Sequence, residues 1–150
     1  MSDDEFPSEL LTIAREATLV FVEDHEPGYG AIDSFLWGNG ARSYTVELGA
    51  NDTRAEQVQA FLHELFHFDK KFIGYSLRPR RPVQGAEPIV SSCGFRIIEY
   101  EDNRDDGIEA AIEACGQAVY RTKPDIVAEL TMLIETYQQR EEARHADLPF

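Results

Sequence analysis

The sequence predicts a single α+β domain in which a small twisted antiparallel sheet packs on one central helix, with two further helices near the C-terminus. Three observations predict this fold class. Two alternating apolar segments flank the dipeptide Asn39-Gly40, which is typical of a β-hairpin turn. A helical apolar pattern follows a capping sequence near residue 53. Two later segments, 107–120 and 124–144, also have apolar residues at helical spacing. At 150 residues, the chain has the length of one domain with a real core.

The elements that precede the central helix are short. Residues 8–17 are expected to form a helix, because their apolar side chains share one face. The run of β-branched and aromatic residues at 18–24 predicts a strand. Residues 31–37 and 41–48 are the two arms of the predicted hairpin. We expect the last strand before the central helix, residues 43–49, to be an edge strand to which an extended peptide can add.

The central helix is predicted from its start signal. Thr53 and Glu56 have the spacing of a capping box, and the helix should run from about Arg54 to Lys70 or Lys71. The connection at 73–94 is rich in proline and glycine, so we expect a long irregular segment with a short strand near its end. Residues 95–101 are then expected to form a strand.

The charge of the chain excludes several functions. There are 28 acidic residues against 14 basic ones, which gives a net charge of −14. A nucleic-acid-binding surface needs many basic side chains, and so does binding to an anionic membrane; we expect neither partner. Only three of the basic residues are lysines. A lysine-poor acidic surface would suit a halophilic cytoplasm, where salt screens the self-repulsion; an ordinary acidic protein is the alternative.

The N-terminal stretch "MSDDEFPSEL" resembles no targeting signal. It has neither a basic segment nor an apolar core of the kind that a signal peptide carries. No apolar run in the chain approaches 18 residues. We therefore expect a cytoplasmic protein, with a component of a virus particle as the alternative.

The stretch "FLHELFHFDKKF" contains the candidate metal-binding and catalytic residues. His63, Glu64 and His67 form an H-E-x-x-H pattern inside the predicted central helix. Residues four apart project from the same side of a helix, so both imidazoles can bind one Zn²⁺. The adjacent Glu64 can reach a zinc-bound water without being a ligand, and acts there as general base. Ala60, one turn before His63, is small enough to leave space above the imidazoles.

A catalytic zinc site needs a third protein ligand. No further histidine follows His67 at the spacing that metzincins use. A carboxylate is therefore expected, and the segment "PDIVAELTMLIETY" offers Asp125 and Glu129 one helical turn apart. The alternative is that these two are ordinary surface acids near a helix N-terminus.

The combination of "HELFH" with "DIVAEL" resembles the gluzincin side of the zincin metallopeptidases, and in particular small phage-type and antirestriction-type zincin domains. The resemblance implies that Asp125 is the third zinc ligand and that Glu129 supports a histidine ligand. The aspartate is one methylene shorter than the usual glutamate, so the reverse assignment stays open. The resemblance covers about a dozen positions.

We therefore expect zinc-dependent peptide-bond hydrolysis on a peptide or protein substrate. A donor for the oxyanion is also needed, and the candidates are Tyr75, Tyr137, His145 and the arginines Arg78, Arg80 and Arg81. One alternative is a catalytically silent zincin-fold component of an oligomer or larger assembly, such as a virus particle. Another is a toxin–antitoxin or repressor-cleaving protease with one dedicated substrate.

Overall fold

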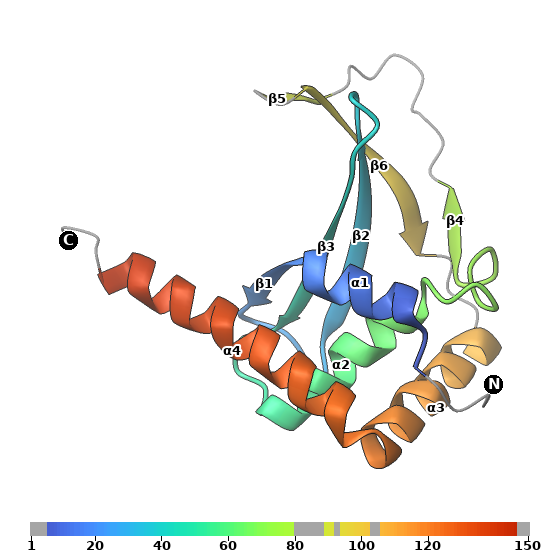
Figure 1. The fold of residues 1–150 in the computed structure, drawn as a ribbon, viewed down its shortest axis with the longest axis vertical. Helices are drawn as coiled ribbons and strands as arrows, with labels where there is room; N and C mark the ends of the chain where they lie inside the picture. The colour runs from blue at the N-terminus through green and yellow to red at the C-terminus, as the bar shows by residue number, and fades with distance from the viewer. Residues whose placement is uncertain (1–5, 80–88, 92–93, 103–105, 147–150) are drawn as a thin grey trace.

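The computed structural model describes residues 6–79, 89–91, 94–102 and 106–146, and it confirms the predicted α+β class (Figure 1). Its elements in chain order are α1 (Ser8–Glu16), β1 (Thr18–Val22), β2 (Gly30–Trp37), β3 (Arg42–Gly49), α2 (Arg54–Phe66), β4 (Leu77–Pro79), β5 (Ile89–Ser91), β6 (Gly94–Asp102), α3 (Asp106–Thr122) and α4 (Pro124–Ala146). Among the described helices, none combines the length and the apolar character that a bilayer crossing requires.

The sheet is mixed, whereas a wholly antiparallel one was predicted. Its strands lie in the order β1-β3-β2-β6-β4, and β5 also pairs with β6. The β1–β3 pair is parallel and the others are antiparallel. The parallel pair arises because the chain reverses direction twice between these strands, once after β1 and once in the hairpin. Strand β3 has neighbours on both sides, so the prediction that it is an edge strand is wrong.

The predicted hairpin is confirmed. Strands β2 and β3 pair from Gly30 opposite Leu48 to Leu36 opposite Arg42. Gly40 has φ +86° at the tip, a conformation that glycine adopts without steric cost.

Helix α2 begins where the sequence predicts and ends earlier. Both hydrogen bonds of the capping box between Thr53 and Glu56 are present. The helix ends at Phe66, with His67 as its C-cap, instead of reaching residue 70 or 71. Beyond this point, N–H groups bond to carbonyls three residues back, as Phe68 does to Leu65, so the chain continues in tight turns.

Helix α2 lies at the centre of the molecule. It contacts β2 and β3 on one side and α1, α3 and α4 on the others. Phe61, Leu62 and Leu65 are fully buried, and each such side chain stabilises the fold by about 1.5–3 kcal/mol relative to an exposed one. The side chains of α2 are therefore carried by a helix that is packed on several sides.

Candidate metal centre

The two histidines of the H-E-x-x-H pattern lie side by side at the C-terminal end of α2. Their ring centroids are 5.1 Å apart. The side chain of His67 is 2% exposed and that of His63 is 18% exposed. The sequence-based expectation that both imidazoles share one side of the helix is confirmed.

Glu109 of α3 brings a carboxylate to both imidazoles. Its Oε2 lies 2.7 Å from His63 Nε2, and its Oε1 lies 3.2 Å from His67 Nε2. Ligand atoms of these three residues lie within 4.8 Å of one another. Ligands at 2.0–2.1 Å in a tetrahedral zinc site are about 3.3 Å apart, so small side-chain shifts would fit these atoms around one ion.

Glu113, one turn after Glu109, holds the other side of the His63 ring. Its Oε2 lies 2.8 Å from His63 Nδ1, and its Oε1 accepts a hydrogen bond of 3.0 Å from Gln117. Burial by itself raises the pKa of the Glu113 carboxyl, but the hydrogen bonds from Gln117 and His63 outweigh burial and leave that pKa lowered. Glu113 is thus an anionic acceptor that fixes the orientation of the ring.

The two nitrogens of His63 face two carboxylates. A neutral imidazole has one N–H and one lone pair, so the lone pair of a neutral ring would point at a carboxylate oxygen. The arrangement is favourable when a proton or a cation lies between Nε2 and the Glu109 carboxylate. This geometry suits a metal ion, with Glu113 accepting the Nδ1–H as ligating histidines usually require.

The close approach of α3 to α2 explains why Glu109 and Glu113 reach the histidines. Gly116 of α3 faces the backbone of His63 and the side chain of Leu62, and a Cβ at this position would lie 3.6 Å from both His63 N and Leu62 Cβ. A larger side chain would push the helices apart. Because residues 109 and 113 are four apart, both carboxylates project from the same side of α3.

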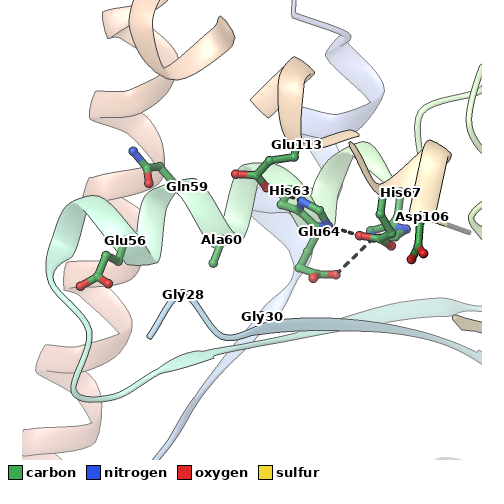
Figure 2. Close-up of a pocket in the computed structure, with 11 residues that line it drawn as sticks. Gly28, Gly30, Glu56, Gln59, Ala60, His63, Glu64, His67, Asp106 and Glu113 are labelled. Carbon is green, nitrogen blue, oxygen red and sulfur yellow. Dashed lines mark hydrogen bonds and ion pairs between the residues drawn. The ribbon is translucent and has the colours of Figure 1, made fainter. Parts of the chain in front are cut away.

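Glu64 lies between the helix and the sheet. Its side chain is 7% exposed, and its Oε2 is 4.0 Å from His67 Nε2. Strand β2 passes close beneath it, since a Cβ on Gly30 would lie 3.2 Å from Glu64 Cγ. Figure 2 shows the Glu64 side chain on the face of α2 that points towards Gly30. A carboxylate is therefore held beside the histidines without joining the cluster of candidate ligands.

These residues surround a pocket of about 470 Å³ along α2 (Figure 2). Its lining comprises Gly28, Gly30, Glu56, Gln59, Ala60, His63, Glu64, His67, Asp106, Glu109 and Glu113. Apart from the two histidines, every ionisable lining residue is acidic, so the local field favours a cation. Ala60 contributes to the open space, as the sequence predicts.

Asp125 and Glu129, one of which was expected from sequence to be the third ligand, do not line this pocket. Neither belongs to the cluster of candidate ligands among the described residues. Glu129 Oε1 instead forms a 2.7 Å ion pair with Arg15 of α1. The acid pair beside the histidines is Glu109 and Glu113, which has the same four-residue spacing and which sequence reasoning missed. That spacing in "EAAIE" was the available signal.

None of the oxyanion candidates in the described residues lines the pocket. The Tyr137 hydroxyl donates a 3.0 Å hydrogen bond to the carbonyl of Ala17. Tyr75 is 65% exposed, and Arg78 lies on β4. Arg80, Arg81 and the side chain of His145 lie outside the described part of the chain.

Comparison of the chain with known proteins found no match. The chain matches no protein-family model, and it shows no significant similarity to curated proteins or to solved structures. The function must therefore be argued from the site.

Proposed function

We propose that this chain hydrolyses peptide bonds with a zinc ion held by His63, His67 and Glu109, and with Glu64 as the general base. The observation that carries the proposal is the position of Glu109, whose two oxygens face the Nε2 atoms of both histidines. Three protein ligands with room for a fourth are the composition of catalytic zinc sites. The H-E-x-x-H part of the resemblance to gluzincins supports the roles of His63, Glu64 and His67, whereas the role of Glu109 rests on the geometry alone.

The chemistry divides between the ion and the protein. A zinc ion in this position would lower the pKa of a bound water towards neutrality and polarise a substrate carbonyl. Glu64 would take the proton of the attacking water and pass it to the departing amine. Burial between α2 and β2 holds the Glu64 carboxylate in place, which avoids an entropic cost at each turnover. Glu113 would hold the His63 ring through Nδ1.

The pocket favours an extended substrate. It runs along α2 and is bounded by Gly28 and Gly30 at the start of β2. Strand β6 pairs with β2 only from Ser34 onwards, so no strand within the described ranges covers the second edge of residues 30–32. A peptide in this groove would find backbone donors and acceptors there, as in other complexes formed by strand addition.

The test combines metal analysis with a cleavage assay. We expect the purified protein to bind one zinc ion per chain and to cleave members of a mixed peptide library, detected by mass spectrometry. Glu64→Gln should keep zinc but lose hydrolysis. Glu129→Gln, a charge-neutralising change outside the pocket, is the matched control and should retain both properties.

Each outcome distinguishes between alternative functions of the site. Absence of zinc uptake on titration would overturn the proposed site altogether. Zinc binding without cleavage of any library peptide would favour the alternative, a catalytically silent component of a larger assembly. Normal cleavage by Glu64→Gln would show that the assigned base is wrong even if zinc binds.

A further inference from the structure

The pocket beside the candidate metal centre carries more negative charge than one zinc ion can offset. Apart from the two histidines, its ionisable lining residues are Glu56, Glu64, Asp106, Glu109 and Glu113. No lysine or arginine in the described part of the chain lines it. A zinc ion supplies two positive charges, so the pocket stays negative when the ion is bound. A ligand that carries positive charge would offset this surplus.

Two of these acids have no part in holding or using the metal. The other three belong to the metal centre in the roles proposed above. Figure 2 shows Glu56 at one end of the row of lining residues and Asp106 at the other, with His63 and His67 between them. The two remaining acids are therefore available to a substrate at opposite ends of the pocket.

Glu56 has a carboxylate oxygen that the fold does not use. Its Oε1 accepts a 3.0 Å hydrogen bond from the backbone N–H of Thr53 in the capping box. Its Oε2 forms no hydrogen bond or ion pair with a described residue. Hydrogen bonds from the backbone and side chain of Thr53 lower the pKa of the Glu56 carboxyl, so this group is anionic at neutral pH.

The position of Glu56 determines which part of a substrate can reach it. Glu56 precedes His63 by seven residues on α2, which is about 10 Å along the helix axis. An extended peptide advances by about 3.3 Å per residue, so its third residue from the cleaved bond lies level with Glu56. An α-amino group next to the cleaved bond would be too far away. A basic side chain further along the peptide is the group that fits.

Asp106 lies nearer to the metal centre. It is the first residue of α3 and precedes Glu109, the candidate third ligand, by one turn, or about 4.5 Å along the axis. It forms no hydrogen bond or ion pair with a described residue. A positive group within about one residue of the cleaved bond would therefore meet Asp106.

The strand side of the pocket is acidic as well. The pKa of Tyr29, which lies between the two glycines of the lining, is raised. Burial is the largest cause, and the hydrogen bond to Glu47 and the charges of Glu47, Glu64 and Asp33 raise this pKa further. A peptide between α2 and β2 would thus lie in a negative field on both sides.

We infer that the substrates of this site are basic peptides, in which an arginine or lysine about three residues from the cleaved bond is bound by Glu56. The inference rests on the proposed function, because the position is counted from a bond cleaved at the metal. A second basic side chain, close to the cleaved bond on its other side, would meet Asp106. The same charges repel acidic peptides, which adds to the specificity.

An arginine scan tests the inference. The peptides share a neutral sequence and an acetylated N-terminus, and one arginine is moved residue by residue across the cleaved bond; the reference peptide has glutamine instead. We expect kcat/KM to be highest with arginine about three residues from the bond, by roughly two- to fivefold over glutamine, which is the effect of one exposed ion pair. Added salt should reduce this preference. Acetylation excludes recognition of a free α-amino group.

Two variants test the assignment to Glu56. Glu56→Gln keeps the acceptor of the capping box but removes the charge, so the preference for arginine at the third residue should disappear. Gln59→Glu adds an acid to the lining one turn closer to His63, so the preferred arginine should shift by about one residue towards the cleaved bond. Glu142→Gln, a change at an exposed acid outside the pocket, is the matched control and should keep the wild-type profile. Circular dichroism checks that each variant is folded.

The outcomes separate this inference from the proposed function. Equal cleavage of the arginine and glutamine peptides would overturn the inference while zinc-dependent hydrolysis stands. An unchanged arginine profile in Glu56→Gln would show that Glu56 does not bind the basic side chain. If no peptide is cleaved, the proposed function fails, and fluorescence anisotropy with labelled forms of the same peptides still tests the charge preference. Equal affinities of the wild-type protein for the arginine and glutamine peptides would then overturn it.

Discussion

Glu109 Oε2 lies 2.7 Å from His63 Nε2, although 46 positions separate the two residues in the sequence. This contact joins the start of α3 to the end of α2, and the same carboxylate reaches His67. It converts a two-histidine pattern on one helix into a three-residue cluster.

The first prediction concerns the third ligand. Glu109→Gln keeps the size of the side chain but removes its charge, so zinc affinity should fall by more than the roughly 10–100-fold that loss of an outer-shell partner costs. Asp125→Asn and Glu129→Gln should leave affinity unchanged. Isothermal titration of the metal-free proteins with zinc measures all three. A large loss with either α4 variant and none with Glu109→Gln would restore the assignment expected from sequence.

The second prediction concerns Glu113. Glu113→Ala removes the acceptor of His63 Nδ1, and zinc affinity should fall about 10–100-fold. Glu113→Gln can still accept this hydrogen bond through its amide oxygen, so its loss should be smaller. Competition with a fluorescent zinc chelator ranks the two variants. Equal losses would indicate that the charge of Glu113 matters and that its hydrogen bond does not.

The third prediction concerns Gly116, where α3 approaches α2. Gly116→Ala places a Cβ at an ordinary contact distance of 3.6 Å, so it should fold normally and gain up to about 1 kcal/mol from better helix propensity. Gly116→Leu should overpack the contact and cost about 1–3 kcal/mol. It should also weaken zinc binding, because Glu109 and Glu113 move with α3. Urea unfolding measures the stability of each variant, and zinc titration measures its affinity for the ion. A Gly116→Leu variant with wild-type zinc affinity would show that the contact between α3 and α2 does not affect zinc binding.

The fourth prediction concerns Gly30 beneath Glu64. The Cβ of Gly30→Ala would lie 3.2 Å from Glu64 Cγ and 3.3 Å from Ala60 Cβ, so the carboxylate must shift. Peptide hydrolysis should fall while zinc affinity stays near the wild-type value, since Glu64 is not a proposed ligand. Gly28→Ala is a poor control because Gly28 has φ +80°, which strains other residues. The rate of peptide cleavage and the zinc affinity should be measured on the same protein sample. Unchanged cleavage by Gly30→Ala would show that the position of Glu64 does not limit the rate.

The fifth prediction concerns pH and the start of α2. Hydrogen bonds from the Thr53 backbone and side chain lower the pKa of the Glu56 carboxyl. Because the folded-state pKa is depressed, this contribution to stability is fully present above the ordinary carboxyl pKa and is lost as pH falls through the lowered value. Urea unfolding from pH 7 to pH 3 should show this loss in the wild type.

Thr53→Ala is the matching variant for the capping box. It removes the side-chain cap and should cost about 1 kcal/mol at neutral pH. Its stability should change less between pH 5 and pH 3 than that of the wild type, because part of the interaction with Glu56 is gone. If the unfolding free energies of the two proteins change equally with pH, the Thr53 side chain does not contribute to the pH dependence attributed to Glu56.

Local patterns in the sequence determined helix α2, which carries the two histidines, and the hairpin beside it. The capping box at Thr53 and the apolar spacing that follows it predict α2, and the Asn39-Gly40 turn predicts the hairpin. Both depend on residues that are neighbours along the chain, and helical spacing alone places His63 and His67 on one side of α2. The two histidines and Glu64, the proposed base, were therefore found without tertiary information.

Tertiary packing decided the partners of the two histidines. Helices α3 and α4 each carry two acids four residues apart, and helical periodicity treats the two pairs alike. The choice depends on which helix brings its acids to the end of α2. Gly116 lets α3 lie close to the backbone at His63, while Glu129 of α4 pairs with Arg15. The third candidate ligand is thus set by the distance between two helix backbones, which no spacing within one helix encodes.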